Sequence, residues 1–305
     1  MIMEKCNKYK KYIRTDLAAE SMPDTDTLTA ANNEGASGIK YTEENKSGYQ
    51  VETLQVLNEH GESATGRPVG TYITINVGKL WLASDDQVGD AVDVISDELR
   101  ALADRLLPKS GGVLICGLGN REITSDAVGP LAVRDVTVTR HIRGSDAKLF
   151  ALLGSREISA LAPGVVGQTG IETAELVRGA SEKAVPGLIV VIDALAARST
   201  DRLAATVQLC DTGLSPGSGI GGSRKALNAD ALGVPVIAIG VPTIVDSSTL
   251  VCDAFERAGL DEIPPALEAV LENGRSFFVS RGDSDIAVST LSSVIARAVN
   301  ATFLG

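Results

Sequence analysis

Two short runs of purely apolar residues, 188–192 and 113–116, constrain the fold of this chain most strongly. Such runs are too short for typical helices and lack the alternation of half-exposed strands, so they predict strands buried on both faces of a sheet. Apolar residues also recur at helical spacing from Val88 to Leu106, and Pro108 closes that helix. Strands that alternate with amphipathic helices predict an α/β fold, with three layers and a mostly parallel or mixed central sheet covered by helices on both faces.

Weaker patterns predict the remaining elements. Further strands are expected at 71–77, where alternation suggests a half-exposed strand, and at 149–153, 205–210 and 234–239. Helices are expected from about 126 onward, from a capping box at Thr169 and Glu172 to about 180, and at 225–231, 246–258, 264–272 and 283–300. Residues 18–68 are polar with little periodicity. We therefore predict a single domain over 17–305 whose first part, 17–68, is loosely packed.

Composition limits the classes of function. The net charge of -11 argues against a nucleic-acid binder, because affinity for phosphate depends on Lys and Arg, but it allows a basic protein as partner. The four cysteines show no CxxC spacing, which indicates reduced thiols and a cytoplasmic protein. No stretch approaches the length of a membrane-spanning helix, and the lysine-rich N-terminus lacks the apolar block of a secretory signal, so no membrane association is expected.

Three glycine-rich segments resemble known motifs only in part. The Gly117-x-Gly119 turn has Glu122 where a dinucleotide site needs a third glycine, and no phosphate-binding glycine-lysine-serine/threonine run is present. Gly213–Gly217 has the letters of a serine-hydrolase elbow, but Pro216 lacks the N–H that an oxyanion hole requires. The stretch 216–222 instead indicates a close approach of the backbone to a substrate strand.

Cysteine and metal chemistry are weakly supported. Cys116 ends a strand, yet His60 lies in a polar stretch and His141 in a basic one, and neither spacing suggests a catalytic pair. A zinc site needs clustered nitrogen and sulfur ligands, which the sequence lacks. We therefore expect no cofactor and no metal.

Two aspartates remain as candidates for chemistry. Asp126 lies in the turn after strand 113–116, and Asp193 directly follows strand 188–192. Each alone is explained as a helix cap. Together they lie at the carboxyl edge of one sheet, where open α/β folds bind ligands. Two neighbouring carboxyl groups share a proton, so one can take a proton from water while the other donates to the oxyanion.

The residues around these aspartates resemble the germination protease family. The matching blocks run in the order of that family: Gly117–Glu122 with Asp126, Gly129 and Pro130; Pro163–Thr173; Asp193–Arg198; Asp211–Gly213 with Pro216–Gly219; and Gly233–Thr243. The resemblance implies an aspartic-type endopeptidase that degrades small acid-soluble spore proteins at germination. It also implies a fold related to the hydrogenase-maturation endopeptidases, a homotetrameric zymogen, and catalytic roles for Asp126 and Asp193.

The N-terminus resembles the site at which members of that family process themselves. The segment Ile13-Arg14-Thr15-Asp16-Leu17-Ala18 implies cleavage between Asp16 and Leu17, with residues 1–16 as a propeptide. Two alternatives stay open. A metallopeptidase of the hydrogenase-maturation type would use the same two acids as ligands, and a non-catalytic module would bind spore proteins without cutting them.

Overall fold

The computed structural model describes residues 12–22, 38–108, 111–215, 225–260, 264–272 and 277–304. Within these residues nine strands form one sheet in the spatial order β1-β2-β3-β7-β8-β6-β4-β5, and β9 pairs with β8. The strands are β1 (Ile39–Lys46), β2 (Tyr49–Val56), β3 (Gly70–Asn76), β4 (Val113–Gly117), β5 (Ile158–Leu161), β6 (Leu188–Ala197), β7 (Thr206–Cys210), β8 (Val236–Asp246) and β9 (Phe278–Val279). The half β8-β6-β4-β5 is parallel and the half from β1 to β8 is antiparallel, which confirms a mixed α/β sheet.

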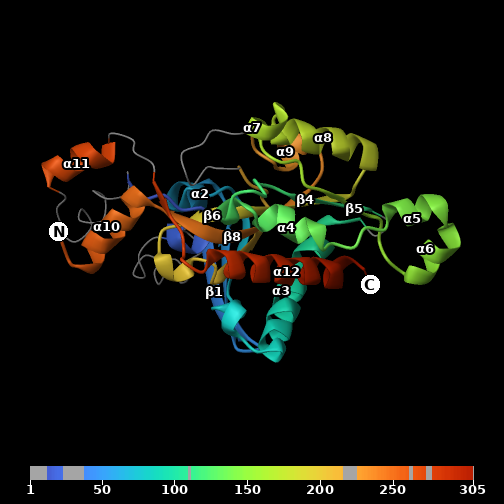
Figure 1. Cartoon of the computed structure of the whole chain (residues 1–305), viewed down its shortest axis with the longest axis horizontal. Coiled ribbons are helices and arrows are strands. Elements are labelled where there is room, and N and C mark those ends of the chain that lie inside the picture. The colour runs from blue at the N-terminus through green and yellow to red at the C-terminus, as the bar shows by residue number, and fades with distance from the viewer. Residues whose placement is uncertain are drawn as a thin grey trace.

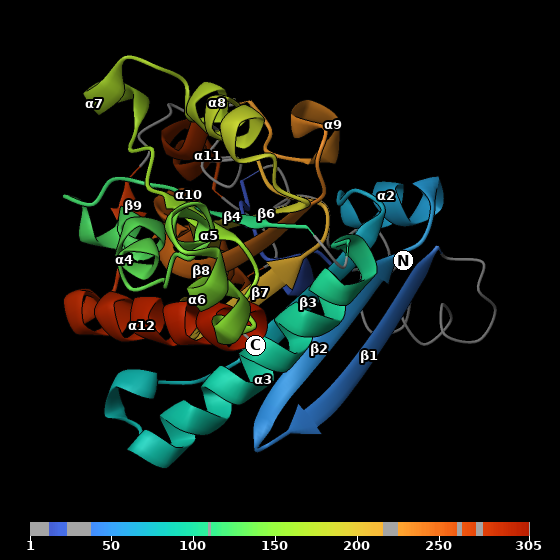
Figure 2. The same ribbon diagram turned by 90° about the vertical axis from the view of Figure 1, so that its right-hand side faces the viewer.

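Helices cover both faces of this sheet (Figures 1 and 2). The helices are α2 (Glu59–Thr65), α3 (Asp85–Leu106), α4 (Val128–Arg134), α5 (Arg140–Ser145), α6 (Ala147–Leu153), α7 (Val166–Thr169), α8 (Thr173–Ala184), α9 (Ala229–Leu232), α10 (Ser247–Arg257), α11 (Pro265–Glu272) and α12 (Ser284–Phe303). Helices α3, α4 and α12 form the larger core with one face, and α8 packs on the other. The short 3-10 turns are η2 (Ala18–Ser21), η3 (Leu80–Leu82), η4 (Thr124–Asp126) and η5 (Thr200–Arg202).

Helix α12 is long and apolar enough, by length and composition alone, to cross a membrane. The expectation that no stretch reaches this length is therefore wrong. Leu291, Ile295 and Phe303 of this helix are nevertheless buried in the larger core, where α12 packs against α3 and α4. Its apolar character matches the burial of a core helix.

The prediction of a loosely packed segment at 17–68 is wrong for most of its described part. Strands β1 and β2 form an antiparallel hairpin in register from Ile39↔Val56 to Lys46↔Tyr49, and β2 continues the sheet to β3. The side chain of Asn45 accepts from the N–H of Gly48 at 3.1 Å and closes the turn. The sequence of this segment shows little alternation of apolar and polar residues because β1, the edge strand, is mostly exposed and polar.

Two further local predictions are wrong, and both concern the start of a helix. Residues 149–153 lie in helix α6 rather than in a strand, since the Asp146 side chain accepts from the N–H groups of Lys148 and Leu149 and caps that helix. Leu152 is 84% exposed, so the run is not buried. The predicted capping box is also absent, because α8 begins at Thr173 with no side-chain cap.

Strand β3 is buried on both sides instead of half exposed. Thr71, Thr74 and their apolar neighbours from Thr71 to Ile75 are all buried. One side of β3 packs into the larger core, and η2 contacts the strand as well. The alternation therefore separates an apolar face from a polar face that is covered by other parts of the chain.

Gly129 allows a close backbone contact between α4 and the parallel strands. A Cβ atom at Gly129 would lie 2.4 Å from the carbonyl oxygens of both Ile192 and Leu118. The Gly129→Ala substitution must therefore push α4 away from β4 and β6, and we expect it to lower the free energy of unfolding by roughly 2–3 kcal/mol. Urea titration measures this loss.

The matched control is Gly179→Ala, in the middle of α8, where an added Cβ meets nothing within 4 Å. That change is expected to be neutral or to stabilise the helix by up to about 1 kcal/mol. Equal unfolding midpoints for the two variants would contradict the close contact at Gly129.

Candidate active site

Asp193 lies inside strand β6, not after its end. The strand continues to Ala197 because β8 pairs with it in parallel up to Val245. Its other neighbour, β4, ends at Gly117 opposite Ile192. Asp193 is thus the first residue of β6 beyond β4, is only 7% exposed, and accepts from the N–H of Ala194 at 3.0 Å. The carboxyl edge predicted from the sequence belongs to β4, and β6 runs past it.

Asp126 ends η4, in the turn between β4 and α4. Its carboxylate accepts from the N–H of Asn120 at 2.7 Å, which ties the aspartate to the start of the turn. Gly119 has φ of +110°, and a Cβ there would lie 2.0 Å from the carbonyl oxygen of Asp126. Only glycine allows this fold of the turn. Asp126 is partly exposed, whereas Asp193 is buried.

The structure brings the turn that holds Asp126 against the strands that surround Asp193. The N–H of Leu118 donates to the carbonyl oxygen of Ile192 at 2.8 Å. On the other side of the turn, the Thr243 hydroxyl of β8 donates to the carbonyl oxygen of Ser125 at 2.6 Å. One hydrogen bond therefore joins the start of the turn to β6 next to Asp193, another joins the end of the turn next to Asp126 to β8, and η4 contacts both strands.

The expected cleavage site lies on the edge of β6 that β4 leaves uncovered. The N–H of Asp16 donates to the carbonyl oxygen of Ala196 at 2.8 Å, and the N–H of Ala196 donates to the Asp16 carboxylate at 2.9 Å. Leu17 is fully buried in a small cluster with Leu195, and Ala18 is 1% exposed. Residues 12–22 are thus an ordered part of the fold on the strand that also holds Asp193.

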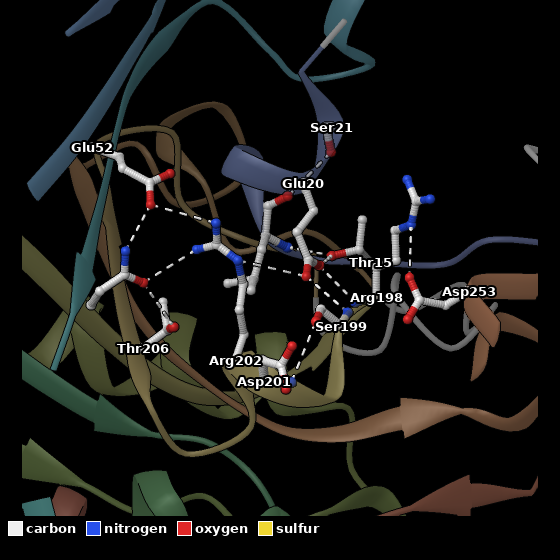
Figure 3. Close-up of polar contacts among 12 residues, drawn as sticks. Thr15, Glu20, Ser21, Glu52, Arg198, Ser199, Asp201, Arg202, Thr206 and Asp253 are labelled. Carbon is white, nitrogen blue, oxygen red and sulfur yellow. Dashed lines mark hydrogen bonds and ion pairs between the residues drawn. The ribbon is translucent and has the colours of Figure 1, made fainter. Parts of the chain in front are cut away.

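Glu20 fastens this segment to the chain beyond β6 (Figure 3). Its carboxylate accepts from the N–H groups of Arg198 and Ser199 at 2.6 and 2.9 Å and from the Thr15 hydroxyl at 2.5 Å. The guanidinium of Arg202 lies 3.8 Å from it and reaches Glu52 at 3.5 Å. A network of buried charges therefore covers this end of the sheet.

A row of polar side chains crosses the same face and was not predicted from the sequence. Glu52, Thr74 and Gln208 pair in register across β2, β3 and β7, and Gln208 and Asp193 both pair with Gly240 of β8. Paired residues point to the same face of a sheet. All four side chains are at most 7% exposed. Gln208 in the middle of an otherwise apolar strand was the signal that could have found this row.

The rejected nucleophiles stay unsuitable in the structure. Cys116 is fully buried, and burial raises the pKa of its thiol to about 12. His60 and His141 are exposed on α2 and α5. Residues 216–224, including Pro216 and the stretch expected to approach a substrate, lie outside the described residues. In the described part of the chain, no three His, Cys, Asp or Glu side chains gather as a metal site.

Comparisons with known proteins point to one family. The family model described as germination protease matches residues 16–258. Germination proteases of Caldanaerobacter subterraneus subsp. tengcongensis and Clostridium perfringens are 41% and 38% identical to this chain. The first alignment covers 80% of this chain and 72% of the relative, and the second covers 87% and 79%. A germination protease of Bacillus pumilus is 38% identical, over 80% of this chain and 66% of its own length.

A comparison with solved structures also finds similarity to part of the chain. The [NiFe] hydrogenase maturation protease HycI from Thermococcus kodakarensis KOD1 aligns with 57% of this chain and 97% of its own, at 17% identity and a TM-score of 0.31.

We expect Glu20→Ala to release the N-terminal segment. The change removes the acceptor of two backbone N–H groups, each of which costs about 1–3 kcal/mol when left unpaired in a buried place. The free energy of unfolding should fall by about 2–4 kcal/mol, and trypsin should cut after Arg14 in the folded protein. Glu44→Ala, at an exposed ion pair with Lys46, is the control and should cost at most about 1 kcal/mol. Equal trypsin resistance of the two variants would refute the anchoring role.

Alkylation of Cys116 tests its burial. The thiolate is the reactive form, and with a pKa of about 12 roughly one thiol in ten thousand is ionised at pH 8. We expect iodoacetamide to leave Cys116 unlabelled in the folded protein and to label it in urea at the same pH, as mapped by mass spectrometry. Similar rates in both conditions would contradict the burial of this thiol.

Proposed function

We propose that this chain, which belongs to the germination protease family and is therefore a peptidase, is an endopeptidase that activates water with Asp126 and Asp193. The observation that best supports the proposal is the joining of the turn at Leu118 and the strand at Ile192, next to Asp193. This contact sets a buried acid and a partly exposed acid on adjoining segments. Unequal surroundings of this kind separate the roles of two carboxyl groups.

In the proposed reaction, the ionised aspartate takes a proton from water while the oxygen of that water forms a bond to the scissile carbonyl carbon. The protonated aspartate donates its proton to the carbonyl oxygen. The tetrahedral intermediate then collapses: one of its two hydroxyl groups returns a proton to the aspartate that had protonated the carbonyl oxygen, and the C=O bond forms again. The C–N bond breaks, and the proton taken from water passes to the leaving nitrogen. One carboxylic acid and one amine are formed, and the pair returns to its shared-proton state.

The first substrate in this proposal is the chain itself. The bond between Asp16 and Leu17 lies along β6, with Asp16 paired to Ala196, three residues or about 10 Å along the strand from Asp193. Cleavage there would remove residues 1–16 as a propeptide. An acidic residue before the bond and an apolar residue after it would then also describe the sites that are cut in other proteins.

Substrate, assembly and location follow from the family resemblance. We propose that the mature peptidase starts the degradation of small acid-soluble spore proteins at germination, acts as a homotetramer, and works in the cytoplasm of the forespore and the spore core. The net charge of -11 favours encounters with substrates that carry basic patches.

Isosteric variants test the aspartate pair. Asp126→Asn and Asp193→Asn keep the shape of each side chain and remove its proton chemistry, so the rate at which residues 1–16 are lost should fall by about 10²–10⁴. Intact mass at intervals after transfer to mildly acidic buffer measures this rate. Asp86→Asn, on the exposed first turn of α3, is the matched control and should process like the parent.

Two results would contradict this proposal. The first is processing at the parental rate in either aspartate variant while circular dichroism shows an intact fold. The second is processing of the parent that stops with a chelator and returns with an added divalent metal, since the two acids would then be ligands.

A further inference from the structure

Gln208 bridges the two sides of the expected cleavage site. Its side-chain N–H donates to the carbonyl oxygen of Asp16 at 3.2 Å, and its side-chain oxygen accepts from the N–H of Ala18 at 2.6 Å. The carbonyl of Asp16 belongs to the bond whose cleavage is proposed above. Gln208 is 7% exposed and lies in the centre of β7, so this contact is made inside the protein.

The geometry imitates the ladder of a parallel sheet. In such a ladder, one residue donates to the carbonyl before its neighbour and accepts from the N–H after that neighbour. Gln208 makes the same two bonds around Leu17, but it does so with its side-chain amide. An amide that binds only backbone groups recognises an extended chain of any sequence. The side chain of Leu17 remains free to define specificity through its pocket with Leu195, Ala197, Leu203 and Val245.

The position of Gln208 links it to the proposed catalytic pair. Gln208 and Asp193 pair with the same residue, Gly240, from opposite sides. Their side chains therefore leave the same face of the sheet, from strands two spacings or roughly 10 Å apart. A carbonyl held by Gln208 above this face is on the side of the sheet from which the Asp193 carboxylate projects.

We propose that Gln208 is a catalytic residue that holds the scissile peptide and stabilises the negative charge that forms on its carbonyl oxygen. The inference rests on the proposed function, because it takes the bond between Asp16 and Leu17 as the one that is cut. When water adds to the carbonyl carbon, the electron pair of the C=O bond moves to the oxygen, and the hydrogen bond from Gln208 strengthens. The same clamp acts on an extended substrate peptide that has an apolar residue after the cut.

Gln208→Met tests the clamp, since methionine has nearly the same shape but neither donor nor acceptor. We expect self-processing of the full chain to slow by about 10²–10³, the loss seen when one oxyanion donor is removed. The mature protein, assayed with a synthetic peptide of residues 12–22, should show the loss in kcat. Gln55→Met, at a half-buried position of β2, is the matched control and should keep the parental rate.

A second variant covers the case in which Gln208→Met fails to fold. Gln208→Glu donates a hydrogen bond while its carboxyl is protonated and cannot do so once that group ionises. The ratio of its processing rate to that of the parent should therefore fall as the pH rises from about 4 to 7. A ratio that is constant over this range would overturn the inference.

The outcomes separate this inference from the proposed function. If the parent processes itself and Gln208→Met matches it, or changes only KM, the role of Gln208 is refuted and the aspartate pair is unaffected. If the parent does not cut between Asp16 and Leu17, or if the asparagine variants of the pair process at the parental rate, the proposed function itself fails.

Discussion

The rest of the structure depends on the unequal length of two neighbouring strands. Strand β4 ends opposite Ile192, while β6 continues to Ala197 and stays paired with β8 along this length. The edge beyond Ile192 would leave backbone N–H groups unpaired, which folded proteins avoid. Three carboxylates take the place of the missing strand: Asp193, Asp16 and Glu20 accept from the N–H groups of Ala194, Ala196 and Arg198 in turn. The edge that β4 leaves open is thus where acidic side chains and the N-terminal segment meet.

The layers and the parallel half of the sheet could be predicted from the sequence because they depend on local patterns. The runs at 113–116 and 188–192 are buried on both faces. A parallel strand buried on both faces is apolar along most of its length, so its sequence is recognisable as a nearly continuous apolar run. Residues 39–56 and 149–153 could not be predicted in the same way. Their structure is decided by a turn at Asn45 and a cap at Asp146, together with the packing of distant elements.

The candidate site was predictable only in part for the same reason. Both aspartates can be identified from the local sequence, because each follows an apolar run. The local sequence does not show how far β6 continues, because the end of β6 is set by its pairing with β8, more than forty residues further along the chain. The local sequence also does not identify Gln208, Thr74 and Glu52 as a group. They form a buried polar row only because β2, β3 and β7 pair. Long-range pairing, rather than local propensity, decides which polar residues share a face.

The docking of residues 12–16 has a consequence for the direction of the processing proposed above. Tyr12 packs against Cys252 beside α11, the N–H of Arg14 donates to the Thr249 hydroxyl, and its guanidinium lies 3.8 Å from Asp246. These few contacts are held at the high effective concentration that a covalent tether provides. The proposed cut after Asp16 would turn the tethered segment into a dilute free peptide, and the same contacts would then be too weak to keep it bound. Under this proposal, loss of the tether would make processing irreversible and would expose α10 and the edge of β6 together.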